Sequence, residues 1–374
     1  MKKLSFSAVS LDIGGIETAL VTLLNYLVEQ KENGKYKYEI TLFLEKKEGA
    51  FLEKIDKKIQ IKKYCPSKCR IVILRKLFNF AKQTVFKIMY KNKFDFSCAY
   101  ATYSKPASFL ARTASQNCCL WVHSEYMQMF DNNKEKYFEF FEGVKANKFK
   151  NIVFVSENAK DIFVNNYKNS KLNENLAKEA TVIYNLIDAE DILKKSQEKI
   201  SEKKLDEIFT FLNVGRHTEE DKKITRLIEA TKKLNENNLN FRLLLVGCGN
   251  KTEEYKNMVK KYNLEEKIIF LGKKTNPYPY FKISDSLILT SEYEGFPVVY
   301  LEAMVLDTPI ITTDVSDSKQ IIQDKFGIVT QKDVDSIYNA MKDAILHGIN
   351  VKEKFDYEKY NQDIKEKLDK IINY

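Results

Sequence analysis

Histidine is scarce in this 374-residue chain, which contains only three: His123, His217 and His347. Six cysteines are scattered along it, and none lies at a spacing that would join these histidines in a zinc site. The cysteines are Cys65, Cys69, Cys98, Cys118, Cys119 and Cys248. Their pattern is typical of reduced cytosolic thiols that fill a core. We therefore expect no metal, no other cofactor and no disulfide.

Long apolar runs are also missing. The longest, such as "FRLLLVG" and "SLILT", have the length of strands and fall far short of the roughly 18 residues that a membrane helix needs. The first residues, "MKKLSFSAVSLDIGG", are interrupted by Asp12 and lack a cleavage site, so they predict a first strand and no leader. We expect a cytoplasmic protein of two domains, each of about 150 to 200 residues.

Several catalytic signatures are absent. The chain has no G-x-S-x-G elbow, no P-loop and no H-E-x-x-H motif. The stretch "VGCGNKT" supplies Gly247 and Gly249 but places Thr252 where a dinucleotide fingerprint needs its third glycine. These absences narrow the choice of enzyme class, and the failed fingerprint argues against a dehydrogenase.

Acidic residues are missing from 57–94, where twelve basic side chains stand. The chain has a net charge of +9, and this patch calls for an anionic partner. Apolar residues recur there at helical spacing: Leu74, Leu77, Phe78, Ala81, Val85 and Ile88. Two accounts remain open. The helix either faces the core with a solvated basic side, or it is a peripheral helix on anionic lipid.

Strands and helices alternate along the whole chain, which predicts the α/β class with two doubly wound parallel sheets facing across a cleft. In the first half we expect strands at 4–9, 38–44, 94–99, 117–122, 151–155 and 181–184, and helices at 16–30, 70–91, 134–147 and 157–167. In the second half we expect strands at 208–214, 241–246, 267–271, 285–290 and 309–312, and helices at 222–236, 252–262, 297–306 and 331–347. The predicted domains are 1–188 and 207–354, with a connection at 189–206.

Two loops of the first domain carry candidate site residues, because ligands of such sheets bind beyond the carboxyl ends of the strands. Gly14 and Gly15 follow the first strand, where glycines let a backbone approach an anion at a helix N-terminus. A plain tight turn explains them as well. His123 follows the strand 117–122 and is equally open to a structural role.

Two loops of the second domain are more specific. Arg216 and Lys222 follow the strand 208–214, and two cations there suit a diphosphate, although a solvated surface pair is the alternative. In "SEYEGFPVVYLEAM", residues 291–304, Glu294 precedes a helix that Pro297 opens, and Glu302 lies on its second turn. Two carboxylates at this spacing suit the two sugars of a nucleotide sugar. The alternative is a surface glutamate plus a helix-face glutamate.

The stretch "EGFPVVYLEAM" resembles the E-x7-E motif of retaining glycosyltransferase family 4, whose members have the two-domain GT-B fold. "GGIET" resembles the family's N-terminal glycine loop, "VFVSENAKDIF" and "VIYNLID" its mid-chain segments, and "VGRHTEEDKK" its Arg/Lys donor site. "LLLVGCG", "IIFLG" and "TPIITTDV" follow in the family's order. The resemblance thus runs along the whole chain, and it implies a terminal helix, 355–374, that packs back on the first domain.

The resemblance also implies roles for individual residues. Glu302 would bind the ribose hydroxyls, and Glu294 would contact the transferred sugar. The implied catalytic set is Glu294, His123, Arg216 and Lys222. The implied donor-binding set adds Gly14, Gly15, Gly247, Gly272, Gly295, Phe296, Pro297 and Glu302. Two departures matter: Lys223 stands where the family often has glycine, so it could exchange roles with Lys222, and "TTDVSDSKQII" lacks a usual glycine and glutamate.

The function that the resemblance implies is a metal-independent, retaining hexosyltransferase. It would move a hexose or N-acetylhexosamine from a nucleotide sugar, with UDP as the expected nucleotide, to a saccharide or lipid-linked acceptor. The lysine- and asparagine-rich composition is typical of low-GC bacteria, where such enzymes build capsule and other surface polysaccharides. The basic stretch 57–94 would bring the enzyme to the inner face of the membrane.

Two other classes of protein remain open. A non-catalytic GT-B protein that binds a nucleotide sugar or a membrane surface would keep the fold and the patch. A nucleic-acid-binding protein is indicated by charge alone, but the chain has no recognisable nucleic-acid module, so we expect no nucleic-acid partner.

Overall fold

The computed structural model describes residues 1–168 and 180–373 and divides the chain into two compact units. The first is Met1–Leu186 with Asn361–Tyr374, and the second is Ile187–Tyr360. The stretch predicted as a connection, 189–206, is part of the second unit. Residues 169–179 and Tyr374, which fall in the predicted first domain and terminal helix, lie outside the described residues.

The first unit is built on a sheet of seven parallel strands in the order β5-β4-β1-β6-β7-β8-β9. The strand β7, "CCLWV", is buried along its full length, as expected where helices cover both faces of a parallel sheet. The strands are β1 (Lys2–Ala8), β4 (Tyr38–Leu44), β5 (Gln60–Lys63), β6 (Phe96–Ala99), β7 (Cys118–Val122), β8 (Asn151–Phe154) and β9 (Ala180–Val182). A separate antiparallel hairpin joins β2 (Lys31–Glu32) to β3 (Lys35–Tyr36).

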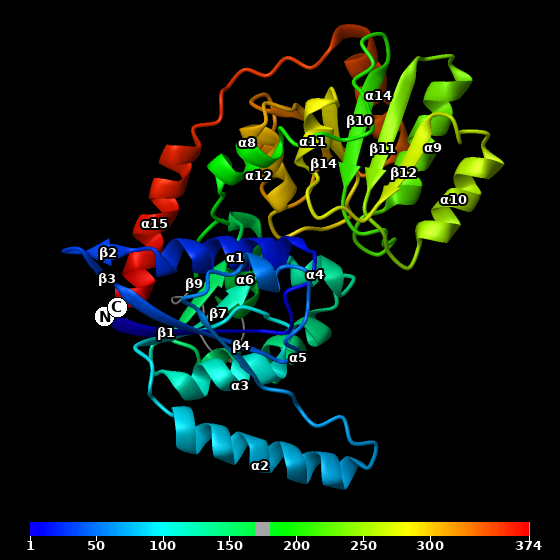
Figure 1. Ribbon diagram of the computed structural model, residues 1–374. Helices are drawn as coiled ribbons and strands as arrows, with labels where there is room; N and C mark the ends of the chain where they lie inside the picture. Colours follow the sequence, from blue (N-terminus) through cyan, green and yellow to red (C-terminus); the bar gives the residue numbers. More distant parts are fainter. Residues whose placement is uncertain (169–179, 374) are drawn as a thin grey trace. The chain divides into compact units, whose positions relative to one another are not determined.

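Helices cover both faces of this sheet (Figure 1). Side chains of α1 and α15 line a small space with Trp121, while Ala111 of α3 and Phe141 of α5 pack with its neighbour Leu120, which points to the other face. The helices are α1 (Gly15–Val28), α2 (Val72–Tyr90), α3 (Lys105–Ala114), α4 (Tyr126–Met129), α5 (Lys134–Gly143), α6 (Glu157–Lys168) and α15 (Tyr357–Asn373). Two 3₁₀ turns, η1 (Leu52–Lys54) and η2 (Ala146–Lys148), complete the unit.

The second unit is built on six parallel strands in the order β12-β11-β10-β13-β14-β15. The helix α9 contacts both α10 and α14, whereas α11 and α12 contact α8, and the two groups lie on opposite sides of the sheet (Figure 1). The strands are β10 (Phe209–Val214), β11 (Phe241–Val246), β12 (Ile268–Gly272), β13 (Ser286–Leu289), β14 (Ile310–Thr313) and β15 (Gly327–Thr330). The helices are α8 (Ala189–Lys195), α9 (Ile224–Glu236), α10 (Thr252–Lys261), α11 (Tyr278–Lys282), α12 (Val298–Val305), α13 (Ser318–Ile321) and α14 (Val334–His347).

Some elements differ from the prediction for local reasons. The predicted helix 134–147 ends at Gly143, because Lys145 adopts a left-handed backbone conformation with φ of 55°. The helix α3 was not predicted from "SKPASFLART". It begins there because Ser104 Oγ accepts a hydrogen bond from the Ala107 amide at 2.9 Å and Pro106 lies in the first turn, where it has no amide to lose.

The sequence predicted no membrane helix, no metal site and no disulfide, and the described part of the chain bears on each of these. None of its helices combines the length and the apolar character needed to cross a bilayer. No group of three or more His, Cys, Asp or Glu side chains within it is arranged to hold a metal ion. All six cysteines are free thiols, and the three on β6 and β7 are buried.

Candidate functional site

In the second sheet, β10 lies between β11 and β13, so the strand order reverses at the pair β10 and β13. Ligands of open α/β sheets bind in the crevice that such a reversal leaves beyond the carboxyl ends of the strands. Arg216 and Lys222 follow β10, and Glu294 follows β13. The structure thus brings together two motifs that are 72 residues apart in the sequence.

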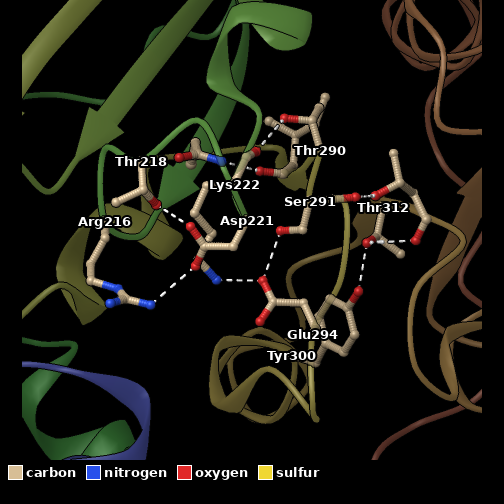
Figure 2. A network of polar contacts seen from close by, with 12 residues as sticks. Arg216, Thr218, Asp221, Lys222, Thr290, Ser291, Glu294, Tyr300 and Thr312 are labelled. Carbon is tan, nitrogen blue, oxygen red and sulfur yellow. Dashed lines mark hydrogen bonds and ion pairs between the residues drawn. The ribbon is translucent and has the colours of Figure 1, made fainter. Parts of the chain in front are cut away.

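Lys222 and Glu294 form the centre of this arrangement. The ammonium of Lys222 donates to Oε1 of Glu294, and both side chains are largely buried, with 19% and 13% of their surface exposed. Ser291 Oγ donates to the same carboxylate oxygen at 2.7 Å (Figure 2). A charge-assisted bond in this semi-buried setting is stronger than one at the surface, so it holds Glu294 in one orientation.

Asp221 holds the loop that carries the cations. It accepts from Arg216 Nη2 at 3.0 Å and from the hydroxyl of Thr218, as Figure 2 shows. Its own backbone oxygen accepts from the amide of Glu292 at 2.7 Å, which ties the loop after β10 to the loop after β13. The side chain of Arg216 remains 68% exposed, so its guanidinium is both oriented by Asp221 and accessible to a ligand.

Lys222 and Lys223 occupy different positions. Lys223 precedes α9 with a left-handed backbone, at φ of 48°, which glycine adopts more easily than any other residue. Thr290 Oγ1 lies 3.2 Å from the backbone oxygens of both lysines and fixes this turn. Of the two ammonium groups, the structure pairs that of Lys222 with Glu294.

Arg226, which the sequence gave no reason to prefer over a solvated surface residue, is largely buried. Its guanidinium donates to Glu292 Oε2 at 2.7 Å and to the Thr290 carbonyl at 3.2 Å, and 15% of its side chain is exposed. Burial raises the pKa of Glu292, but the bond from Arg226 and the charge of Lys332 outweigh it and lower that pKa overall. Arg226 therefore positions the loop that carries Glu294.

Glu302 lies on the second turn of α12 and is 7% exposed, as its apolar neighbours in the sequence predicted. The hydroxyl of Tyr278, at the start of α11, lies 3.4 Å from its Oε1. Burial and the charge of Glu302 raise the pKa of Tyr278, so its hydroxyl stays protonated and able to donate. Tyr278 was missed in the sequence because it lies 24 positions from Glu302.

The start of α12 is held rigidly. Pro297 is its N-cap residue, and the Phe296 ring is buried against Tyr300 at a centroid distance of 6.1 Å. The Gly295 carbonyl accepts from the hydroxyl of Ser316. Ser316 itself has a left-handed backbone, with φ of 52°. Its hydroxyl therefore ties this turn to the start of α12.

Gly247 and Gly272 were expected to bind the donor, and the structure gives each a backbone reason to be glycine. Gly247 has φ of 146°, and a Cβ there would lie 1.8 Å from the Gly215 carbonyl oxygen. Its amide donates to the Gly272 carbonyl at 2.9 Å, and Gly272 has φ of 69° with open space around it. The two glycines let the loops after β10, β11 and β12 approach one another.

In the first unit, Gly14 and Gly15 form the start of α1. Gly14 is the N-cap residue in an extended conformation, with φ of −174°, and Gly15 is exposed in the first turn. A Cβ on Gly14 would lie 2.4 Å from Oε2 of Glu17, the end of a flexible side chain. The amides at this helix end have no side-chain cap, which is the arrangement that suits an anion.

His123 follows β7 and is buried against Tyr100, with ring centroids 4.3 Å apart. Burial lowers its pKa to about 3, with a smaller opposing effect from a hydrogen bond to the Tyr100 backbone. Its Nε2 has no hydrogen-bond partner within the described chain. A neutral imidazole with one unsatisfied buried nitrogen is a feature that a purely structural role does not explain.

Residues 194–362 match the profile of the family described as "Glycosyl transferases group 1". The match covers 169 of the 374 residues, in the second half of the chain. The matched region contains Arg216, Lys222, Glu294 and Glu302, whereas His123 and the glycines at the start of α1 precede it.

Curated proteins similar to this chain include named transferases. The chain is 31% identical over 168 residues to an N-acetylgalactosamine-N,N'-diacetylbacillosaminyl-diphospho-undecaprenol 4-alpha-N-acetylgalactosaminyltransferase of Campylobacter jejuni, with 44% of each protein covered. It is 24% identical over 326 residues to a UDP-Gal:alpha-D-GlcNAc-diphosphoundecaprenol alpha-1,3-galactosyltransferase of Escherichia coli, covering 78% of this chain and 81% of that one. Three of the relatives are matched over only 39% to 51% of their length.

Solved structures match over the whole chain. Anabaena HepE in complex with UDP and glucose gives a TM-score of 0.73 at 18% identity, covering 98% of this chain and 99% of that one. Staphylococcus aureus TarM gives 0.73 at 13% identity, with 100% of both chains covered. The predicted GT-B fold, with two parallel-sheet α/β domains, is confirmed.

Proposed function

We propose that this protein is a retaining glycosyltransferase that moves a hexose or N-acetylhexosamine from a UDP-linked donor to a saccharide or lipid-linked acceptor. One observation carries the proposal. Within the region that matches the group 1 profile, the largely buried ion pair of Lys222 and Glu294 lies beyond the ends of β10 and β13. The exposed side chain of Arg216 lies beside it. A cation next to a carboxylate suits the junction between a diphosphate and its sugar.

The two cations would bind the diphosphate. Each is paired with a carboxylate in the structure, Arg216 with Asp221 and Lys222 with Glu294, so the site carries little net charge of its own. An arriving diphosphate would share these cations and match the two donors of a guanidinium. As the sugar leaves, negative charge grows on the diphosphate, and fixed cations stabilise that charge.

The two glutamates would bind the two sugars of the donor. Glu302, held at Tyr278 on the buried helix α12, would accept from the vicinal hydroxyls of the ribose. Glu294 would contact hydroxyls of the transferred sugar through its Oε2, since Lys222 and Ser291 both donate to Oε1. The ribose contact exists before and during the reaction, whereas the contact to the transferred sugar changes as the bond breaks.

Transfer with retention would take place on one face of the sugar. The departing phosphate oxygen would take the proton of the acceptor hydroxyl while the acceptor oxygen bonds to the anomeric carbon. His123, whose pKa is lowered to about 3 by burial, is neutral at physiological pH and would serve as a hydrogen-bond partner, not as an acid. Gly14 and Gly15 would offer α1 amides to the phosphates.

The names of similar proteins support the choice of substrates. A solved neighbour binds UDP-glucose, and two curated relatives are named for acceptors on diphospho-undecaprenol. These features favour a UDP-sugar, a lipid-linked acceptor and a role in bacterial surface polysaccharide synthesis such as capsule. We propose that the enzyme acts at the cytoplasmic face of the membrane without a metal, since side-chain cations supply the charge.

A donor screen by mass spectrometry tests this proposal. The full chain is incubated with UDP- and GDP-sugars, with and without EDTA, and release of the free nucleotide is measured. We expect slow release of UDP from one donor, unchanged by EDTA and reduced by Glu294→Gln. The exposed Glu266→Gln variant is the matched control. Binding of UDP without release from any donor or acceptor would instead show a non-catalytic binding protein.

A further inference from the structure

Helix α2 leaves most of its large apolar side chains exposed to solvent. Among its nineteen residues only Phe86 is buried. Asn79, Gln83 and Tyr90 are half-buried, and with Phe86 they repeat at the spacing of one helix face. The face that contacts the fold is therefore a narrow one that mixes two aromatic with two polar side chains, whereas a surface helix usually turns its whole apolar stripe inward.

The opposite face is largely apolar, with Thr84 as its one polar residue. At about 100° per residue, the side of α2 away from Phe86 collects large apolar side chains. These are Ile73, Leu74, Leu77, Phe78, Phe80, Val85 and Ile88, with exposures between 38% and 78%. Single exposed apolar residues are ordinary on a protein surface, whereas a contiguous apolar face marks an interaction site.

One aromatic cluster fixes this orientation. The Phe86 ring lies 5.2 Å from Phe43, 5.6 Å from Tyr64 and 6.0 Å from Phe109, measured between ring centroids. Asn79 Oδ1 accepts from the Ser67 amide at 2.6 Å on the same side. Figure 1 shows α2 on the outside of the first unit, beyond α3. The apolar face is thus held outward by specific contacts.

Basic residues border the apolar face on both sides. By helical angle, Arg75 and Lys82 lie between the apolar face and Phe86, and Lys82 Nζ donates to the Cys65 carbonyl at 2.7 Å. Lys76 and Lys87 lie along the other edge, with Lys87 Nζ 5.9 Å from the Phe109 ring centroid. They belong to the twelve basic residues of 57–94, a stretch without a single acidic residue. In the described part of the chain, only Lys58 among these twelve forms an ion pair.

We propose that α2 docks on an anionic lipid bilayer, parallel to its surface. The apolar face would enter the boundary between headgroups and acyl chains, and the flanking Lys and Arg would reach the lipid phosphates while their aliphatic stems cover apolar surface. A second copy of the chain fits this face poorly, because pairing two such faces brings like charges together with no acidic residue of 57–94 to oppose them. This site goes beyond the proposed transfer reaction.

Vesicle sedimentation of the full chain tests the proposal. The vesicles are phosphatidylcholine alone or phosphatidylcholine with phosphatidylglycerol, and neither donor nor acceptor is present, so failure here leaves the proposed transfer reaction untouched. We expect binding to the anionic vesicles that is weakened by salt. Arg75→Gln with Lys76→Gln should weaken it roughly 25-fold, at about fivefold per charge. Lys367→Gln with Lys370→Gln on α15 is the matched control and should change nothing.

The apolar face has its own variant. Ile73→Gln with Ile88→Gln replaces two of the most exposed large apolar side chains in the described part of the chain, so folding should be unaffected, as circular dichroism can check. It should weaken vesicle binding by roughly tenfold or more for each isoleucine. Leu346→Gln with Val351→Gln, exposed in the second unit, is the control. Equal or absent binding to both vesicle types would overturn the proposal. So would sedimentation velocity showing a dimer that the α2 variant converts to a monomer.

Discussion

Helices α2 and α12 are both rich in apolar residues, yet the two units use them in opposite ways. The short helix α12 buries seven of its eight residues, including the carboxylate of Glu302, whereas α2 buries one of nineteen. Folding alone favours neither a charge in a buried helix nor an apolar stripe on an exposed one. Each helix therefore departs from the usual pattern at the residues to which we assign a function.

The largest expected difference between the two helices is in stability. Leu301→Ala on α12 removes a fully buried side chain and should lower the free energy of unfolding by about 2 to 5 kcal/mol. Leu77→Ala on α2, where the side chain is 58% exposed, should change it by less than about 0.5 kcal/mol. Guanidinium unfolding of both variants measures this. Similar losses from both would show that α2 is part of a core.

Substitutions of Glu302 and Glu294, under the roles proposed for them, should have different kinetic effects. Glu302→Gln weakens a contact present before and during the reaction, so the loss should fall on donor affinity. Glu294→Gln perturbs the sugar being transferred, so it should fall on turnover. Losing a charge-assisted hydrogen bond costs about 1.5 to 3 kcal/mol, or roughly tenfold to a hundredfold in the affected constant. Calorimetry and single-turnover transfer separate the two, and wild-type behaviour in both would remove the assigned roles.

In the first unit, His123 should make stability depend on pH. Its pKa is lowered from 6.5 to about 3 by burial, so between these values the unfolded chain binds more protons. The free energy of unfolding should therefore fall on acidification, by about 2 kcal/mol from pH 7.5 to pH 5. His123→Gln should remove that part of the slope, and the exposed His347→Gln should not. An unchanged slope in His123→Gln would mean that the pKa of His123 does not differ between the folded and unfolded protein.

The smallest effect expected concerns Arg226. Its bond lowers the pKa of Glu292 below the ordinary 4.5, so the stability that it adds is present above that pH and is lost as the pH falls through the pKa of Glu292. Arg226→Met should cost no more than about 1 kcal/mol at neutral pH, since Glu292 is partly exposed. The gap in melting temperature from wild type should close below pH 4.5. Lys232→Met, which breaks a surface pair, is the control.

The sequence predicted the regular elements well where burial on both faces sets the pattern. The strands 38–44 and 241–246 have the predicted bounds, because buried parallel strands read as continuous apolar runs. Short elements such as β15 and α13 were missed, since four residues carry too little periodicity to stand out. Helix ends depended on single backbone conformations, such as that of Lys145, which composition does not specify.

The sequence named Glu294, Glu302, Arg216 and Lys222 as candidates but did not predict their contacts. Ser291 and Asp221 lie in the same loops as the residues they bond. The contacts of Lys222 with Glu294 and of Tyr278 with Glu302 form only when the sheet brings separate segments together. For α2 the pattern alone left two accounts open, since core-facing and lipid-facing stripes have the same period. Its exposure excludes the core-facing account.

Calorimetric titration with UDP tests most directly the claim that the ends of β10 and β13 form the donor site. The account predicts that UDP binds the wild-type protein more tightly than ATP or NAD, that EDTA has no effect, and that Arg216→Gln and Lys222→Gln each weaken binding by about tenfold or more. Arg216 is largely exposed, so its variant should fold normally, and Lys260→Gln on α10 is the control. UDP affinity that survives both substitutions, or that requires a divalent metal, would contradict the account.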